Sequence, residues 1–253
     1  MAYTNSPLVN YTRITNNRTS QRRNKIDSII IHCFVGQVTA QRGVDYFATT
    51  KSQSSSNYVV GYDGSIGLSV PESDRAWTSG GSDKNGNPIR VNGISGADFD
   101  HRAVTIEVAS DNKAPYAVTD AALNSLIKLC ADICKRNGIK ELKWKNDKSL
   151  VGKTEQQNMA VHMWFANKAC PGEYLLNKHS YIANEVNKIL KAEEKEEDKK
   201  VENKEPSDYA KVSCEKAVNL GIIKGNSSGN FMWHESLTRQ DFCVLMDRMG
   251  LLK

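Results

Sequence analysis

The sequence predicts an α/β fold, in which helices flank a central β-sheet, and a small α-helical module at the C-terminal end. Three stretches predict the main fold. Residues 26–33 (IDSIIIHC) form a β-branched apolar run, typical of a strand covered on both faces. Residues 101–110 (HRAVTIEVAS) alternate between two faces, as a strand does. Residues 119–138 repeat apolar side chains at helical spacing.

A hairpin and a last helix complete the main domain. Residues 57–70 (NYVVGYDGSIGLSV) are two strand-like pieces around Asp63-Gly64, a dipeptide that favours a hairpin turn. The alternation in the strand at 101–110 makes Glu107 a carboxylate that projects from its middle. A further helix is expected from about Tyr174 into a charged stretch.

The helix over 119–138 carries its own start and stop signals. It is expected to begin with a Thr119 or Asp120 cap and to end at Gly138. Cys130 and Cys134 share its apolar stripe, so we expect them to pack in the core.

The 253 residues allow one substantial core and a small extra module. Residues 191–206 (KAEEKEEDKKVENKEP) contain almost nothing to bury and indicate a linker. The expected organisation is a basic N-terminal segment (1–24), a main domain (25–190), this linker (191–206) and a C-terminal module (207–253).

The formal charge of +5 is concentrated at the front of the chain. Such a cluster would favour a polyanion, whether nucleic acid, an anionic membrane or an anionic cell wall, although a basic run is usually only a solvated surface. We find no zinc-finger spacing and no aromatic RNA-binding signature, so the sequence does not predict a nucleic-acid partner. The basic residues that precede Asp27 are Arg13, Arg18, Arg22, Arg23 and Lys25.

The cysteines and apolar runs exclude two classes of protein. Six cysteines show neither the density nor the clustering of a disulfide framework. No stretch approaches the roughly 18 consecutive apolar residues of a membrane span. The start, MAYTNSPLVNYTR, lacks the apolar core of a secretory signal, so we expect a cytoplasmic protein without a signal peptide.

One short stretch, residues 161–172 (VHMWFANKACPG), is rich in reactive side chains. A histidine near a cysteine is often only a pair of core residues. A third group, His32, ends the strand at 26–33, where a sheet edge would hold its imidazole. His32, His162 and Cys170 would give zinc two nitrogens and a thiolate and leave a fourth position open for water. His101 is an alternative ligand, but only His162 has a cysteine eight residues on, so we expect a solvated or capping role for His101.

The remaining histidines and Cys33 are weaker candidates for the metal site. His179 lies on an expected helix face and His234 lies beyond the linker, and neither has a local set of ligands. Cys33 follows His32 directly, so its side chain should point to the opposite side of the strand, into the core.

These residues resemble the zinc-dependent type-2 N-acetylmuramoyl-L-alanine amidases, which share the fold of peptidoglycan recognition proteins and include many phage endolysins. The resemblance runs from about Tyr11 to about Leu190. It implies a mixed central β-sheet flanked by helices, and a zinc amidase catalytic domain over 25–190. It rests on five motifs in the family's order: KIDSIIIHC, SSNYVVGYDGSI, RAWTSG, RAVTIEVAS and HMWFANKACPGEYL.

Carried over position by position, the resemblance implies that His32, His162 and Cys170 ligate zinc. It implies that Glu107 activates the attacking water. Lys168 matches a residue that stabilises the oxyanion in part of the family. These residue types suit these roles, because a carboxylate can move a proton and a lysine can oppose a growing negative charge.

The hairpin motif belongs to the substrate cleft in the family, so Asn57 is an expected substrate-binding residue. Trp77 is expected to stack on sugar or peptide, although a cleft aromatic is about as often packing. Two positions depart from the family. Tyr58 falls at a different register from the catalytic tyrosine of some members, so no catalytic role is assigned to it. The familiar Ala-Trp-His reads Ala76-Trp77-Thr78 here.

The C-terminal module is similar to a single S-layer homology repeat, through AVNLGIIKGNSSGNF and ESLTRQDF. Two helices are expected, the second capped at Thr238 with Asp241 in capping-box position. One short repeat buries little surface alone. Binding to a secondary cell-wall polymer, formation of a homodimer, and docking on the main domain all stay open.

The resemblance therefore implies a peptidoglycan hydrolase, a phage endolysin or autolysin that cuts the amide between N-acetylmuramic acid and L-alanine and reaches the wall after holin- or lysis-mediated release. One alternative is a non-catalytic peptidoglycan-binding protein, although that branch typically loses a zinc ligand. The other is an amidase that recycles soluble muropeptides in the cytoplasm.

Overall fold

The computed structural model describes residues 3–49, 53–202, 205–227 and 229–252. The chain forms two compact units, Met1–Leu190 and Lys191–Lys253. None of the helices within the described residues is both long and apolar enough to cross a membrane.

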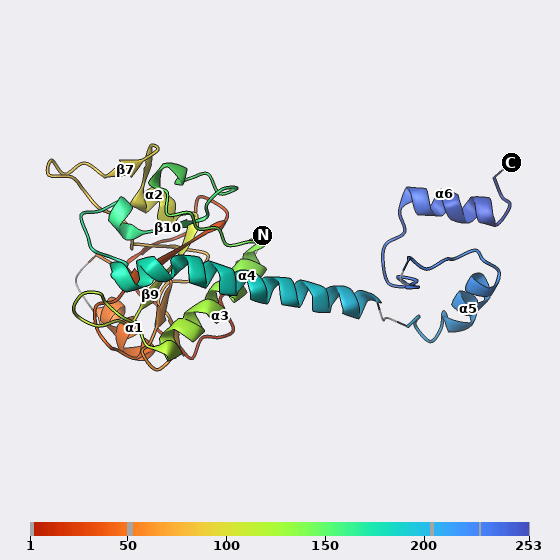
Figure 1. Cartoon of the computed structure of the whole chain (residues 1–253), viewed down its shortest axis with the longest axis horizontal. Coiled ribbons are helices and arrows are strands. Elements are labelled where there is room, and N and C mark those ends of the chain that lie inside the picture. Colours follow the sequence, from red (N-terminus) through yellow and green to blue (C-terminus); the bar gives the residue numbers. More distant parts are fainter. Residues whose placement is uncertain (1–2, 50–52, 203–204, 228, 253) are drawn as a thin grey trace. The chain divides into compact units, whose positions relative to one another are not determined.

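The first unit is built on a six-stranded mixed sheet, which confirms the predicted fold class (Figure 1). The strand order is β1-β5-β4-β9-β3-β10, and only the β4–β5 hairpin pairs antiparallel. Two small two-stranded ribbons, β2–β6 and β7–β8, accompany the sheet. The strands are β1 (Tyr11–Thr12), β2 (Arg18–Thr19), β3 (Ser28–Cys33), β4 (Tyr58–Val60), β5 (Ile66–Leu68), β6 (Arg75–Ala76), β7 (Arg90–Val91), β8 (Ile94–Ser95), β9 (Ala103–Val108) and β10 (Met159–Ala160).

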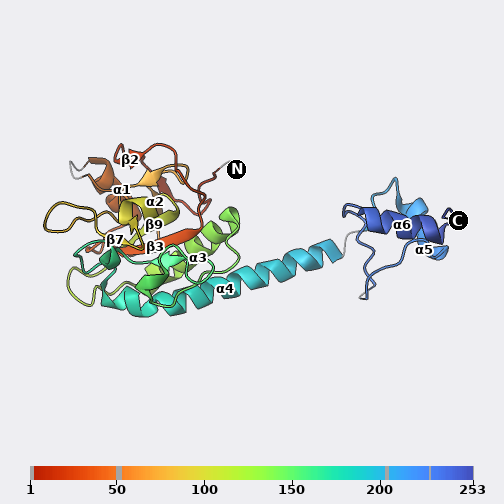
Figure 2. The same ribbon diagram turned by 90° about the horizontal axis from the view of Figure 1, so that it is seen from above.

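Helices cover both faces of this sheet, as the apolar run of β3 predicts. Figure 2 shows α3 and α4 on one side of β3 and β9, with α1 and α2 on the other. Every residue of β3 is buried, with Ile29 and Ile31 in the core toward α3 and Ile30 in the core toward α2. The helices of this unit are α1 (Ala40–Thr49), α2 (Gly96–Asp100), α3 (Asp120–Asn137) and α4 (Gly172–Glu202), with 3₁₀ turns η1 (Lys148–Leu150) and η2 (His162–Trp164).

The local signals for α3 are confirmed. Thr119 caps the helix by accepting a hydrogen bond from the Ala122 amide, and Gly138 ends it at φ 68°, a left-handed conformation that suits glycine. Cys130 and Cys134 are fully buried in the core. The predicted hairpin is also present, with β4 and β5 joined by a turn in which Gly64 has φ 81°.

The basic N-terminal segment is part of the folded unit. Strand β1 pairs with β5 and β2 pairs with β6. Arg13 and Arg18 form ion pairs with Asp45 and Asp74, each at 2.9 Å. The guanidinium of Arg22 is buried and donates to the carbonyls of Glu72, Asp100 and Ala103 and to the Asn57 side chain, while Arg23 pairs with Asp98. These four arginines therefore have partners within the chain.

The second unit contains α5 (Lys211–Asn219) and α6 (Arg239–Arg248), and α4 runs into it from the first unit. The predicted capping box at the start of α6 is present, because Thr238 and Asp241 exchange hydrogen bonds. Neither α5 nor α6 contains a buried residue. This unit consequently presents apolar side chains to solvent, including Leu220, Leu237 and Phe242.

Candidate active site

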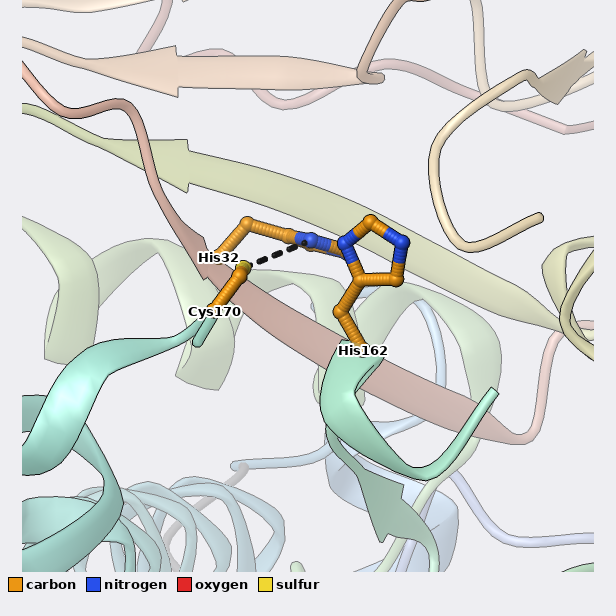
Figure 3. A group of neighbouring side chains, drawn as sticks. All are labelled: His32, His162 and Cys170. Carbon is orange, nitrogen blue, oxygen red and sulfur yellow. Dashed lines mark hydrogen bonds between the residues drawn. The ribbon is translucent and has the colours of Figure 1, made fainter. Parts of the chain in front are cut away.

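Three of the predicted site residues lie together at one end of the sheet. His32 is near the end of β3, His162 begins η2, and Cys170 comes just before α4. One ligand atom from each lies within 4.8 Å of the others. The Cys170 Sγ is 3.2 Å from the His32 Nδ1, and the two imidazole ring centroids are 5.1 Å apart (Figure 3).

The two histidines of this group are in a protonation state that can bind a cation. Burial lowers the pKa of His32 well below its usual value, with His162 and His179 adding to the effect. Burial also lowers the pKa of His162. Both imidazoles are therefore neutral near pH 7 and can offer a lone pair. The His162 Nε2 is buried without a hydrogen-bond partner.

Cys170 needs a positive neighbour to become a thiolate. Its hydrogen bond with Cys33, followed by burial and the nearby Glu107 carboxyl, raises the pKa of Cys170 in the metal-free chain. A metal ion would reverse that balance, because coordination deprotonates a thiol. Two neutral imidazoles and one cysteine sulfur, with an open side, are a donor set that fits zinc.

Glu107 lies beside these donors because β3 and β9 are parallel neighbours in register. Its Cα is paired directly with that of His32. Glu107 lines a pocket of about 370 Å³ together with His162, Trp77 and Thr78. The Glu107 Oε2 is buried without a hydrogen-bond partner, and burial raises the pKa of this carboxyl well above its usual value. A carboxyl in this state can accept and release a proton inside the pocket.

The first unit also matches a protein-family model over residues 22–173, and that family is described as N-acetylmuramoyl-L-alanine amidase. The chain belongs to this amidase family. The match covers β3, β9 and all four residues of the group, His32, His162, Cys170 and Glu107. No match was found among curated proteins.

Several solved structures are similar to this amidase at low sequence identity. A selenomethionine derivative of AmpD is 17% identical, with a TM-score of 0.50 over 72% of this chain and 99% of that one. Staphylococcus aureus AmiA, solved with its ligand, is 16% identical, with a TM-score of 0.49 over 73% and 83% of the two chains. A mutant endolysin from Bacillus subtilis is 18% identical, with a TM-score of 0.45 over 70% and 99%.

The other predicted site residues of the amidase are Trp77, Lys168 and Asn57, and only Trp77 lines the pocket. Trp77 lines the pocket, and its indole N–H donates to Thr19 Oγ1 at 2.8 Å. Lys168 is exposed, and its charge adds to burial in lowering the pKa of His162, whereas the Gly80 backbone acts to raise it. Asn57 is fully buried and does not line the pocket.

The Asn57 side chain forms hydrogen bonds with three segments that are far apart in the sequence. Its Oδ1 accepts hydrogen bonds from Arg22 and from the Thr105 amide, and its Nδ2 donates to the Val70 carbonyl. Tyr58, to which no catalytic role was assigned, donates its hydroxyl to Glu72 at 2.6 Å. Asn57 therefore has a structural role in this fold, and the predicted substrate contact finds no support in its position.

Cys33 lies in the core as predicted, and it has a second position at the pocket that was not predicted. Its side chain belongs to the core cluster and also lines the pocket, where interaction with Cys170 lowers the pKa of the Cys33 thiol. Cys33 is the last residue of β3 and follows His32 directly, so it lies at the same end of the strand as the site.

The remaining histidines have protein partners. His101 is buried and is the C-cap residue of α2, and its Nδ1 accepts a hydrogen bond from the Arg23 amide at 3.2 Å. The capping role is therefore the one that the structure shows, and His101 is not solvated. His179 is buried against Trp144, with ring centroids 4.6 Å apart, and its Nδ1 lies 2.6 Å from the Leu175 carbonyl.

Sequence reasoning missed two polar residues behind His32. The Ser79 Oγ lies 3.4 Å from the His32 Nε2, and the buried Asp100 carboxylate accepts a hydrogen bond from the Ser79 amide at 2.9 Å. The only local signal was the position of Ser79 directly after the Trp77-Thr78 pair that departs from the family motif.

Proposed function

We propose that this amidase is a zinc-dependent peptidoglycan hydrolase that cleaves the bond between the lactyl group of N-acetylmuramic acid and L-alanine. The observation that carries the proposal is the convergence of His32, His162 and Cys170 within 4.8 Å, with Glu107 in register beside them. His32, His162 and Cys170 would hold the ion. When bound, zinc supplies a Lewis acid for the amide carbonyl and lowers the pKa of a water to about 7.

The chain's own residues would do the rest. Glu107 would take a proton from the attacking water and hand it to the leaving amine of L-alanine, as its buried, partnerless Oε2 allows. Lys168 would bring positive charge toward the carbonyl oxygen as that oxygen becomes negative. Trp77 would pack against the sugar or peptide at the pocket wall.

Digestion of purified Gram-positive cell walls tests the reaction. We expect new L-alanine amino termini to appear with the intact enzyme, to vanish when a chelator removes the metal, and to return when zinc is restored. The reason is that the ion held by His32, His162 and Cys170 would activate the attacking water. New reducing sugar ends, or activity that survives chelation, would contradict this mechanism.

The same assay separates the alternatives. A non-catalytic peptidoglycan-binding protein would release nothing from walls or fragments. An amidase for soluble muropeptides would release L-alanine termini from small fragments but not from intact walls. The proposed place of action is the wall after lysis-mediated release, in a phage or prophage lysis system, and this part of the proposal rests on the sequence resemblance.

The second unit is proposed to anchor the enzyme to a cell-wall polymer. It contains a pocket of about 330 Å³ lined by Phe231 and Trp233, whose rings are stacked at 5.2 Å, and by Lys224 and Arg248. Aromatic faces and cations together suit an anionic sugar polymer. A homodimer through the exposed apolar side chains is the competing proposal for this S-layer-homology-like unit.

Replacing Trp233 with alanine is expected to lower binding of the full chain to purified walls at least several-fold, because the stacked pair loses its indole ring. Tyr209→Ala is the matched control, since Tyr209 is 92% exposed and lies outside the pocket. Co-sedimentation with walls measures binding, and light scattering measures mass. Unchanged binding by Trp233→Ala together with a dimeric mass would favour the dimer over the anchor.

A further inference from the structure

His32 is engaged at both ring nitrogens. Its Nδ1 faces the Cys170 Sγ at 3.2 Å, and its Nε2 faces the Ser79 Oγ at 3.4 Å. In Figure 3 one ring nitrogen of His162 is also turned toward His32, on the side of the three donors. The nitrogen of His32 that can serve the shared site is therefore Nδ1, and Nε2 points away into the protein. A neutral imidazole carries one proton, so which nitrogen holds it decides whether Nδ1 has a free lone pair.

Ser79 is held rigidly in the position where it meets His32. Its side chain has no exposed surface, and its backbone amide donates to the Asp100 Oδ2 at 2.9 Å. The Thr78 amide donates to the same oxygen at 3.1 Å. The start of α2 packs closely against this turn. Only a glycine fits at position 96, because a Cβ there would lie 1.9 Å from the Ser79 carbonyl oxygen.

The same carboxylate favours one direction for the Ser79 hydroxyl proton. Burial raises the pKa of Asp100, and the nearby Ser79 side chain, with the Ser79 and Thr78 amides, opposes that rise. A carboxylate only accepts hydrogen bonds, so a serine proton beside it turns toward the carboxylate. The lone pairs of the Ser79 Oγ are then left for the His32 Nε2–H.

We propose that Ser79, fixed by Asp100, is a positioning residue that accepts the Nε2–H of His32 and so presents the Nδ1 lone pair to the metal. This inference rests on the proposed zinc dependence. Hydrogen-bond partners of metal-binding histidines fix the tautomer and the ring orientation, and their loss typically costs about 10–100-fold in metal affinity. Ser79 thus acts on the metal only through His32.

Zinc titration of the full chain against a chromophoric chelator tests the role of Ser79. We expect Ser79→Ala to bind zinc about 10–100-fold more weakly than the unaltered chain. Ser69→Ala is the matched control, because Ser69 is equally buried and its Oγ has no hydrogen-bond partner, and its zinc affinity should not change. Equal zinc affinity in the Ser79→Ala and unaltered chains would overturn this inference alone, whereas an unaltered chain that binds no zinc would contradict the proposed function itself.

A second measurement needs no substitution and keeps the inference testable if Ser79→Ala does not fold. Long-range ¹H–¹⁵N correlation spectra of the metal-free, unaltered chain report which nitrogen of His32 carries the proton. We expect the Nε2–H tautomer. Observation of the Nδ1–H tautomer would overturn the inference, because Ser79 would then be donating to His32 and Nδ1 would have no lone pair for a metal.

Discussion

Glu107→Gln is expected to lower the release of L-alanine termini from cell walls by about 10²–10⁴-fold, the usual contribution of a general acid–base group. Glutamine has nearly the same shape, but its amide cannot take the proton of the attacking water. Zinc should stay bound, since Glu107 is not one of the three clustered donors. The assay therefore pairs wall digestion with measurement of zinc content by atomic absorption.

The control for this substitution is a carboxylate of the same type outside the pocket. Glu173 is exposed, comes three residues after Cys170 and lines a different groove. We expect Glu173→Gln to keep its activity. If Glu107→Gln hydrolyses walls at the rate of the unaltered chain, the general base must be another group. If it loses zinc together with activity, Glu107 supports the metal site and its role as a base is not established.

The parts of the site that could be predicted are those fixed by local periodicity. The alternation in β9 placed Glu107 on the face opposite Val104 and Val108, and the structure pairs its Cα with that of His32. The apolar run of β3 similarly placed His32 next to the end of a buried strand, and β3 ends one residue later, at Cys33. In both cases the information lies within six or seven consecutive residues, so a single sequence contains it.

The parts that could not be predicted depend on partners far apart in the sequence. Asn57 is a structural residue because it meets Arg22 and Thr105, 35 and 48 residues away. Ser79 acquires its position from Asp100 and from His32, 47 residues away. Period and composition do not show which distant segments fold against each other, so these polar contacts become visible only in the structure.

An ion pair between the buried Glu72 and Arg136 is another of these distant contacts. Glu72 has no exposed surface, and it accepts hydrogen bonds from Arg136 at 2.6 and 3.1 Å. The Tyr58 hydroxyl and the Asn137 amide donate to the same carboxylate at 2.6 and 3.0 Å. Arg136 also donates to the Thr4 carbonyl. The pair thus joins the N-terminal segment, the hairpin and the end of α3.

Arg136→Met is expected to lower the free energy of unfolding by about 3–5 kcal/mol, because it leaves the Glu72 carboxylate buried without a counter-ion. Urea unfolding of the metal-free chain measures this change. Arg13→Met is the matched control, since Arg13 forms an ion pair with Asp45 in which both side chains are in contact with solvent, and its loss should cost less than about 1 kcal/mol.

The double variant Glu72→Leu/Arg136→Met tests two explanations of this cost. One is the lost attraction between Glu72 and Arg136, and the other is the penalty of burying the Glu72 carboxylate without its partner. If the cost of Arg136→Met comes from the stranded carboxylate, removing that carboxylate as well should recover much of the lost stability, because an apolar pair of similar volume needs no desolvation of charge. The Tyr58 hydroxyl and the Asn137 amide would lose their acceptor, so recovery should be incomplete. A double variant less stable than Arg136→Met alone would contradict this explanation. It would mean that losing the hydrogen bonds from Tyr58 and Asn137 to Glu72 costs more free energy than leaving the Glu72 carboxylate without its arginine.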